Sequence, residues 1–375
     1  MASAVAAGVV GAAVPMRVKR PAIPAPPSSG GSLSRFRRAS LGPEFGYVPG
    51  EQPPDDDSWL KLNTNESPLS PSPDVAAAVM EAAAGLRRYP DPFAEPLRSA
   101  LAHYHGVRTD QVLVLNGADQ AIDCCFRAFC EPGDAVVYPY PTYSLFPVLA
   151  RVFGVGAVEV PLDGDFALPA ALAEVPGPLR FAVNPNSPTG VWMPPDALEE
   201  LLGAAPGVVV VDEAYADFAP ASFVPRLDGH DNMLVLRTFS KAHALAGLRV
   251  GYAIGSPDLI ADLAAVKDSY PLDRCAIAGA LAALEDEPHH RAIVETVVAE
   301  RDRLTARLRR AGWDVPDSGA NFVFARPPDG DARGAQEKLR AQRILVRHFT
   351  SIPDRLRITV GGPQETDRLF QALGV

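Results

Sequence analysis

Lys241 lies in a stretch of the chain that has little structural need of a lysine. The sequence holds five lysines in 375 residues, and this one follows an apolar run in a loop rich in Ser, Ala and Gly. Ser240 precedes it and Arg249 comes eight residues later. A lysine amine can form an imine with an aldehyde cofactor, and a hydroxyl beside an arginine suits a cofactor phosphate. The structural alternative is a solvated lysine at the end of a strand.

Four further polar features follow apolar runs. Asp212 ends one run, where it is either a helix cap or the partner of a cofactor cation such as a pyridinium nitrogen. Tyr215 is either a core tyrosine or a donor to a phenolate-type oxygen. The residues 117–119 open a helical pattern, either as a plain turn or as a phosphate site of backbone N–H groups. Tyr143 could stack on an aromatic cofactor. Together with Lys241, these features indicate a cofactor site.

The elements that must position these residues alternate between two patterns. Short apolar runs without polar alternation occupy 112–115, 135–138, 179–183, 208–211, 233–237 and 251–254. Such runs are typical of strands buried on both faces, and amphipathic helical patterns separate most of them. The sequence therefore predicts an α/β domain with a mostly parallel sheet. The polar residues fall just after the strands, where open α/β sheets bind ligands.

Composition excludes several classes of protein. Hydrophobic residues make up 47% and charged residues 21%, as in ordinary soluble globular proteins. A formal net charge of −10 argues against nucleic-acid binding. No apolar run approaches the roughly 20 residues that a membrane span needs. The four cysteines lack metal-ligand spacing, so we expect reduced core thiols and no metal site in a cytoplasmic protein.

The two ends of the chain differ from the middle. Residues 1–43 lack acidic residues and are rich in Ala, Ser, Pro and Gly, which predicts a disordered extension and makes it a candidate transit peptide to a plastid or other organelle. Residues 44–74 read as an extended, proline-containing arm. We expect a large domain over 75–270 and a smaller one over 271–375. The latter begins with one long helical stretch over about 276–311, followed by strands near 321–325, 344–348 and 356–360.

Several motifs resemble those of pyridoxal-phosphate aminotransferases of fold type I, and within them the histidinol-phosphate aminotransferase family. The resemblance runs from about Tyr47 to the C-terminus. Its most specific motifs are the lysine segment 238–249 and the final Leu-Arg-Ile-Thr-Val-Gly at 356–361. Others are Leu-Asn-Thr-Asn-Glu-Ser-Pro, Arg-Tyr-Pro-Asp-Pro, Asn-Gly-Ala-Asp, Pro-Thr-Tyr, Asn-Pro-Asn-Ser-Pro-Thr-Gly, Val-Asp-Glu-Ala-Tyr and Asn-Phe. It implies a mostly parallel seven-stranded large domain and a smaller α/β C-terminal domain.

The resemblance also implies roles toward pyridoxal 5'-phosphate. Lys241 would form the Schiff base and later move the proton, Asp212 would keep the pyridine nitrogen protonated, and Tyr215 would donate to the ring oxygen. Tyr143 would stack on the ring. The remaining cofactor-binding residues would be Gly117, Ala118, Asp119, Ser187, Thr238, Ser240 and Arg249, with Tyr89 reaching the phosphate from the other subunit of a homodimer.

For the substrates, the resemblance implies that Arg357 binds the carboxylate of glutamate. With Arg347 it would hold the phosphate of histidinol phosphate, because two arginines suit a dianion. Asn321 and Tyr47 would complete the substrate site. The implied reaction moves an amino group between L-histidinol phosphate and 2-oxoglutarate in histidine biosynthesis.

Two positions depart from the family pattern, and three rival functions stay open. Ser187 and Pro271 stand where the family usually has asparagine. The serine can still donate a hydrogen bond, but it is shorter. The rivals are an aromatic amino acid aminotransferase, a threonine-phosphate decarboxylase and a non-catalytic cofactor-binding regulatory module. The last of these would require a fused DNA-binding unit or a lost lysine.

Overall fold

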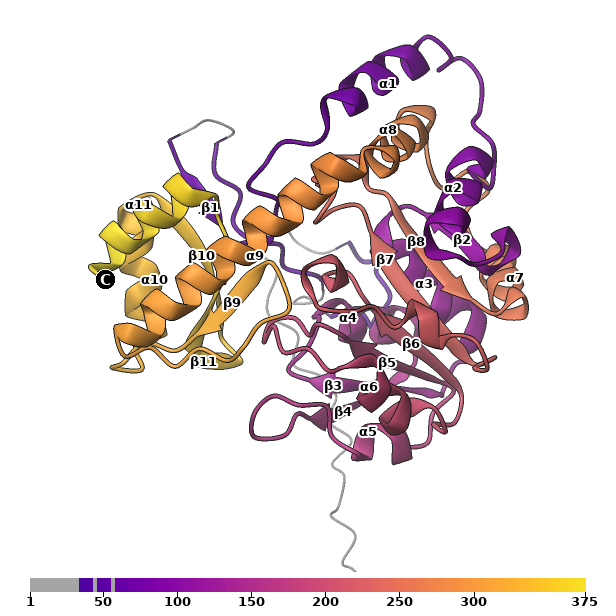
Figure 1. Ribbon diagram of the computed structural model, residues 1–375. Helices are drawn as coiled ribbons and strands as arrows, with labels where there is room; N and C mark the ends of the chain where they lie inside the picture. Colours follow the sequence, from indigo (N-terminus) through magenta and orange to yellow (C-terminus); the bar gives the residue numbers. More distant parts are fainter. Residues whose placement is uncertain (1–33, 43–45, 55–57) are drawn as a thin grey trace, which may run out of the picture.

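The computed structural model describes residues 34–42, 46–54 and 58–375. The predicted disorder and transit function of residues 1–43 therefore fall largely outside the described residues, and the cytoplasmic location stays a prediction. Two sheets organise the described chain, a large one and a small one, and the long helix α9 (Glu287–Arg310) runs between them (Figure 1). No helix in the described ranges is long and apolar enough to cross a membrane.

The large sheet has seven strands in the order β2-β8-β7-β6-β5-β3-β4. Only β8 runs antiparallel to its neighbours, which confirms the predicted mostly parallel sheet. The strands are β2 (Val112–Leu115), β3 (Ala135–Tyr140), β4 (Gly156–Pro161), β5 (Leu179–Val183), β6 (Val208–Asp212), β7 (Met233–Thr238) and β8 (Gly251–Gly255).

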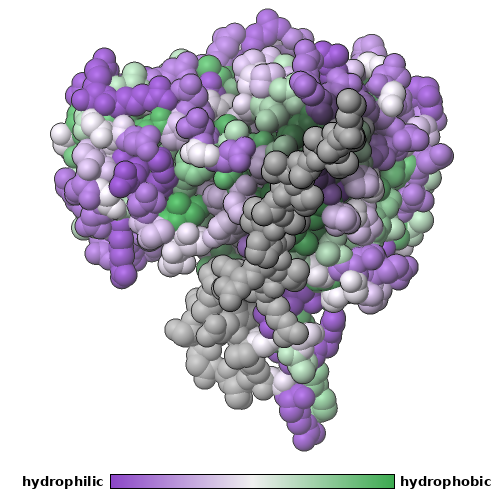
Figure 2. Space-filling model, turned by 90° about the horizontal axis from the view of Figure 1, so that it is seen from below, coloured by the Kyte–Doolittle hydropathy of each residue, from purple (hydrophilic) through white to green (hydrophobic). Residues whose placement is uncertain are grey.

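Helices cover both faces of this sheet, because successive residues of a strand point to opposite sides and apolar residues occur on both. On β6, Val209 and Val211 pack with helices α2 (Glu95–His105), α5 (Ala171–Glu174), α6 (Pro195–Leu202) and α8 (Arg274–Glu285). Val210 packs on the other face with α3 (Gly117–Phe129), α4 (Leu145–Phe153) and α7 (Pro257–Val266). Helix α1 (Pro73–Ala83) lies against α8. Seen from below, the described surface is mostly hydrophilic (Figure 2).

The small sheet has the order β1-β10-β11-β9. Its strands are β1 (Leu60–Leu62), β9 (Phe322–Ala325), β10 (Ile344–Phe349) and β11 (Ile352–Thr359). Leucines of α9, α10 (Ala332–Ala341) and α11 (Pro363–Leu373) pack on it. The arm thus supplies a strand to the C-terminal sheet, and α8 packs in the core of the large sheet although it follows residue 270. The expected division at 270/271 stays a prediction.

Two expectations about elements were wrong. The single long helix expected over 276–311 is divided at Asp286, which lies between α8 and α9. The Asp286 side chain accepts from His289 N–H at 3.2 Å, and Pro288 stands in the first turn of α9, so the chain starts a new helix there. The sequence reading also missed β4, a short strand at the edge of the large sheet.

Candidate active site

The candidate site lies at the carboxyl ends of β5, β6 and β7, where the small sheet and the arm meet the large sheet. Ser187 comes after β5, Asp212 ends β6, and Lys241 follows β7. Arg357 of β11 donates to Ser187 Oγ at 3.2 Å, and Asn65 of the arm donates to the Tyr215 hydroxyl at 3.0 Å. Residues far apart in sequence therefore meet at one sheet edge.

Lys241 is held in a tight turn just beyond β7. The N–H of Ala244 donates to the Lys241 carbonyl at 3.1 Å, and Ala244 adopts the left-handed region at φ 57°. Burial, and after it the positive charge of Arg357, lower the pKa of the Lys241 ammonium to about 8. No carboxylate of the described residues forms an ion pair with it, and its Nζ lies 5.7 Å from the centre of the Tyr215 ring. At pH 7 about a tenth of this amine is therefore neutral and nucleophilic, far more than of an ordinary lysine with a pKa near 10.4.

Asp212 is a buried carboxyl at the end of a parallel strand. Its Oδ1 accepts from the N–H of Ala214 at 3.0 Å, and the side chain is 4% exposed. Burial raises the pKa of this carboxyl to about 7, against the smaller lowering by the Ala214 bond. A cation placed next to this group would restore its charge, so Asp212 fits the partner of a protonated pyridine nitrogen.

This raised pKa predicts a pH-dependent cost in the cofactor-free protein. Between the ordinary carboxyl pKa of about 4 and the folded value of about 7, the folded state binds more protons than the unfolded state. The free energy of unfolding therefore falls as pH rises through this window, by on the order of a few kcal/mol from this group. We expect Asp212→Asn to remove that fall. Urea unfolding of both proteins at several pH values between 4 and 8 measures this difference. The same dependence of the free energy of unfolding on pH in both proteins would contradict the assignment.

The N-terminus of α3 and the end of the lysine segment form a compact cradle. Helix α3 starts at Gly117, so the N–H groups of its first turn have no acceptor within the helix. Arg249 lies against this turn: Nη2 is 3.2 Å from Asp119 Oδ2, and Nη1 donates to Ser240 Oγ at 3.3 Å. Thr238 supports the turn by accepting from Ser240 N–H at 3.1 Å. Free helix N–H groups, a hydroxyl and an arginine together suit a phosphate.

Gly117 is needed in this cradle for two reasons. Its φ is 73°, and a Cβ on it would lie 2.8 Å from Arg249 Nη2. We expect Gly117→Ala to cost about 1 kcal/mol in backbone strain and to push the guanidinium out of place, weakening phosphate-dependent cofactor binding by at least about tenfold. Equilibrium dialysis of the cofactor measures this effect.

Gly106→Ala is the matched control for that variant. Gly106 has a similar φ of 67°, but a Cβ there would meet nothing within 4 Å. It should lose comparable stability and keep its cofactor affinity. Equal loss of affinity in the two variants would show that strain, and not the cradle, is responsible.

Two tyrosines border the space in front of Asp212. The Tyr143 hydroxyl donates to Asp119 Oδ1 at 2.9 Å, which ties its ring to the cradle. Tyr47 contacts the Tyr143 ring edge-on, with centroids 6.3 Å apart. Burial raises the pKa of both phenols, so both stay neutral. The structure thus brings Tyr143 beside the cradle and Tyr47 beside Tyr143.

The small sheet contributes two arginines that face each other. Arg347 on β10 and Arg357 on β11 are directly opposed in the antiparallel register. Arg357 Nη2 donates to the carbonyl of Asn63 at 2.9 Å, and Arg347 donates to the carbonyls of Val48 and Pro49. Arg357 Nε is buried and has no acceptor within the described part of the chain. Like charges directly opposite repel, so this pair favours an anionic ligand.

Two other predicted residues lie at this junction. Asn321 is fully buried, and its Nδ2 donates to the carbonyl of Asn65 at 3.0 Å. Ser187 accepts from Arg357 and also lies close enough to Tyr215 to lower its phenol pKa, although burial raises that pKa overall. Ser187 thus connects the arginine of the small sheet with Tyr215. Pro271 lies nearer the cradle, where its carbonyl accepts from Asn116 Nδ2 at 3.2 Å.

Tyr89 is the one predicted site residue that the structure does not bring to the site of its own chain. Its ring is 76% exposed and stacks on Tyr270, with centroids 4.5 Å apart and planes 13° from parallel. No contact joins it to the described cradle residues.

Sequence comparison then decides the family. The model of the family described as "Aminotransferase class I and II" matches residues 57–373. The chain belongs to this family.

Curated relatives of this aminotransferase carry a more specific name. The chain is 46% identical over 347 residues to histidinol-phosphate aminotransferase 1 of Bradyrhizobium diazoefficiens, and the alignment covers 91% of this chain and 99% of the relative. It is 41% identical over 345 residues to histidinol-phosphate aminotransferase 1 of Nostoc sp., covering 91% and 98%.

Solved structures agree with this grouping. A histidinol-phosphate aminotransferase from Sinorhizobium meliloti in complex with pyridoxal-5'-phosphate superimposes with a TM-score of 0.78 at 28% identity, over 84% of this chain and 89% of that one. A putative histidinol-phosphate aminotransferase from Erwinia carotovora gives 0.80 at 29% identity, over 85% and 96%. The aminotransferase therefore has the fold type I architecture that its motifs predicted.

Sequence reasoning missed two residues of the site. Asn63 and Asn65 of the arm contact Arg357 and Tyr215, yet neither received a role. Both belong to the motif Leu-Asn-Thr-Asn-Glu-Ser-Pro, which carried part of the resemblance. The motif was the available signal, but its contacts depend on pairing with residues 150 and 294 positions away.

Proposed function

We propose that this aminotransferase moves an amino group between L-histidinol phosphate and 2-oxoglutarate, giving imidazole acetol phosphate and L-glutamate in L-histidine biosynthesis. Its cofactor is pyridoxal 5'-phosphate. The observation that carries the proposal is the opposed pair Arg347 and Arg357, on the small sheet beside the lysine site. Relatives at 46% and 41% identity that bear the name histidinol-phosphate aminotransferase support it.

The residues present fit this cofactor. When bound, pyridoxal phosphate supplies a reactive aldehyde and a ring that accepts electrons from the substrate Cα. The cradle of Gly117, Ala118, Asp119, Ser240 and Arg249 suits its phosphate, with Thr238 holding the turn. Burial raises the pKa of Asp212, and a protonated pyridine nitrogen next to it would stabilise the ionised carboxylate. Tyr143, which is tied to the cradle through Asp119, would stack on the ring.

Lys241 and Tyr215 are the two residues that would bind the reacting part of the cofactor and move or donate protons. The Lys241 amine, with its pKa lowered to about 8, would bind the cofactor and, once freed, would take the proton from the substrate Cα. Tyr215 would donate its hydroxyl proton to the ring oxygen. Ser187, whose side chain is shorter than the asparagine that the family usually has there, could donate the same bond to the ring oxygen, and it accepts from Arg357.

The two arginines explain how one site takes two amino donors. Arg357 would bind the carboxylate of glutamate with its bidentate guanidinium, and the buried Nε without a described acceptor supports this role. Histidinol phosphate has no carboxylate, so its dianionic phosphate would take both Arg347 and Arg357. Tyr47 and Asn321 would line the space between them, since Tyr47 lies beside Tyr143 and Asn321 beside Asn65.

We also propose that the enzyme works as a homodimer. Tyr89 would bind the phosphate of the cofactor held by the other subunit, which agrees with its exposure and with the lack of a described contact to the cradle of its own chain. Met80 and Leu86 nearby are 75% and 56% exposed, an unusual cost for a surface that stays in water. A monomeric mass in sedimentation equilibrium of the active protein would contradict this arrangement.

A spectral titration tests the reaction. Histidinol phosphate, phenylalanine and threonine phosphate are added separately, without a keto acid, to the cofactor-loaded enzyme, and the band of the lysine-bound cofactor is followed. We expect histidinol phosphate to convert it at far lower concentration than the others. An equal or better response to phenylalanine would indicate an aromatic aminotransferase. Carbon dioxide release from threonine phosphate would indicate a decarboxylase. If no donor converted the cofactor, a regulatory module would be indicated.

A further inference from the structure

Asn65 connects three parts of the site through its own polar groups. It is fully buried and adopts the left-handed region at φ 57°. Its N–H donates to Thr359 Oγ1 at 3.0 Å, its Nδ2 donates to the Tyr215 hydroxyl at 3.0 Å, and its carbonyl accepts from Asn321 at 3.0 Å. A buried residue in a strained conformation with this many directed contacts is placed there by its surroundings.

These bonds determine which way the amide faces. Thr359 Oγ1 accepts from the Asn65 N–H, so the proton of that hydroxyl is left to donate, and it does so to Asn65 Oδ1 at 3.1 Å. The oxygen of the amide therefore faces Thr359, and its NH₂ group faces Tyr215. Thr359 lies two residues after Arg357 on β11, so the strand of the substrate arginine sets the orientation of this amide.

The amide in turn controls the Tyr215 hydroxyl. A phenol oxygen that accepts from an NH₂ group cannot give its own proton to that group. The proton must point elsewhere. Ser187, the other polar group at this oxygen, accepts from Arg357 and lowers the Tyr215 pKa as a donor does, which leaves the direction of Asp212 and Lys241 for the Tyr215 proton. The Tyr215 ring cannot swing away, because it packs edge-on against Phe322 with centroids 5.0 Å apart.

We propose that Asn65 is a positioning residue that aims the Tyr215 hydroxyl proton at the ring oxygen of the cofactor, under the control of Thr359 on the strand of the substrate arginine. The inference rests on the proposed function. It assigns Asn65 no contact with substrate or cofactor. Its effect passes through Tyr215, and this separates it from a residue that merely fills space.

Two substitutions test the proposal. Asn65→Gly removes the amide while allowing the left-handed backbone, and it introduces no charge. Asn65→Asp keeps the shape but turns the donor into an acceptor, so the Tyr215 proton would point to the carboxylate. The readouts are the apparent pKa of the absorbance change of the bound cofactor and the cofactor dissociation constant. A donor aimed at the ring oxygen stabilises negative charge there, so its loss should raise that apparent pKa.

The expected rise is about one for Asn65→Gly, a tenfold change in the proton equilibrium, and larger for Asn65→Asp. Cofactor affinity should fall by about tenfold or less. The decisive comparison uses Tyr215→Phe. In that background, Asn65→Gly should add almost no further change, because the residue acts through the missing hydroxyl.

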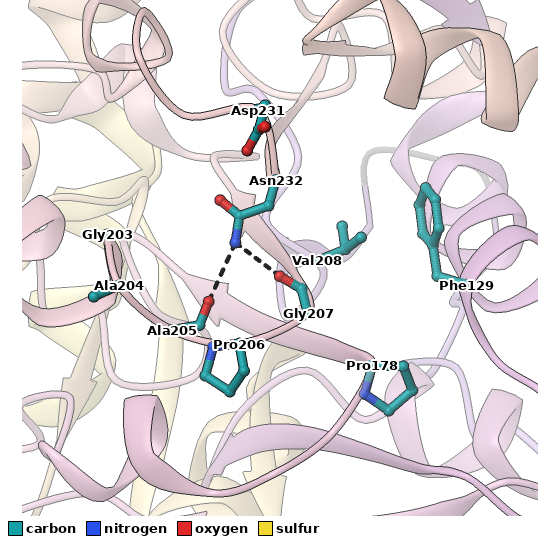
Figure 3. A pocket seen from close by; sticks show the side chains of 10 residues that line it. All are labelled: Phe129, Pro178, Gly203, Ala204, Ala205, Pro206, Gly207, Val208, Asp231 and Asn232. Atoms are coloured by element: carbon teal, nitrogen blue, oxygen red, sulfur yellow. Dashed lines mark hydrogen bonds between the residues drawn. The ribbon is translucent and has the colours of Figure 1, made fainter.

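Asn232→Asp is a matched control for the loss of an amide donor. Asn232 lies at the opposite edge of the large sheet, beside a cavity of about 570 Å³, and its Nδ2 donates to the carbonyls of Ala205 and Gly207 (Figure 3). This variant should lose stability and leave the spectral pKa unchanged.

The outcomes separate this inference from the proposed function. An unchanged spectral pKa in Asn65→Gly with cofactor bound would overturn the role of Asn65, and so would an equal change with and without the Tyr215 hydroxyl. Both results would leave the enzyme intact as a transaminase. A wild-type protein that binds no cofactor would overturn the proposed function and this inference together.

Discussion

Lys241→Ala should give a folded protein whose turnover falls by at least about a thousandfold. The variant removes both the amine that holds the cofactor and the base that moves the substrate proton, and a positioned base alone is worth about 10² to 10⁴. Its fold should survive, because the side chain forms no ion pair with the described residues and truncation leaves no carboxylate unpaired. Steady-state transamination and circular dichroism measure the two effects.

Lys338→Ala is the control for this experiment. Lys338 lies in the last turn of α10, away from the site, so its loss should leave turnover unchanged. The absorbance of the lysine-bound cofactor should vanish in Lys241→Ala and persist in Lys338→Ala. Substantial turnover in Lys241→Ala would exclude the covalent role of this lysine.

Arg357→Ala should weaken the use of both amino donors while the cofactor stays bound. The side chain is partly buried with its Nε fully enclosed, and truncating one partner of a buried charge pair costs about 2–5 kcal/mol. We therefore expect kcat/KM for histidinol phosphate and for glutamate to fall by about a hundredfold or more. Arg357→Lys, which keeps the charge but loses the bidentate fork, should recover only part of this loss.

Arg347→Ala provides the contrast within the same pair. If Arg347 serves the phosphate and not the carboxylate, its loss should reduce kcat/KM for histidinol phosphate much more than for glutamate. Both arginine variants should retain the cofactor absorbance. An Arg357→Ala enzyme that lost only one donor would contradict the shared use of this arginine.

The strands of the large sheet were predictable because burial on both faces gives uninterrupted apolar runs in the sequence. Runs such as 208–211 contain nothing but valine, a β-branched residue that favours strands buried on both faces. The edge strand β4 was harder to predict, since only Ala157 and Val160 of its six residues are buried. The break at Asp286 was missed because helical periodicity continues on both sides, and only the cap and Pro288 reveal it.

The residues of the site also differ in whether the local sequence could predict them. Asp212 and Lys241 were found because each follows its own strand, so local order already places them at one edge of the sheet. Asn65 was not, because its partners Tyr215 and Thr359 are 150 and 294 residues away. The contact between Arg357 and Ser187 likewise requires the small sheet to be placed against the large one, which no local pattern predicts.

The interruption at Asp286 has a mechanical consequence for the enzyme. Helix α9 has 24 residues and is about 36 Å long, at about 1.5 Å per residue. Its first turn is tied to the end of the arm, where Ser72 donates to Asp286 Oδ2 at 2.6 Å, and its last turns carry Leu304 and Leu308 into the core of the small sheet. A tilt of 5° about this fulcrum would move the far end by about 3 Å over that length. A small change in the angle of α9 at its tied end would therefore give a larger displacement at the sheet that carries Arg347 and Arg357.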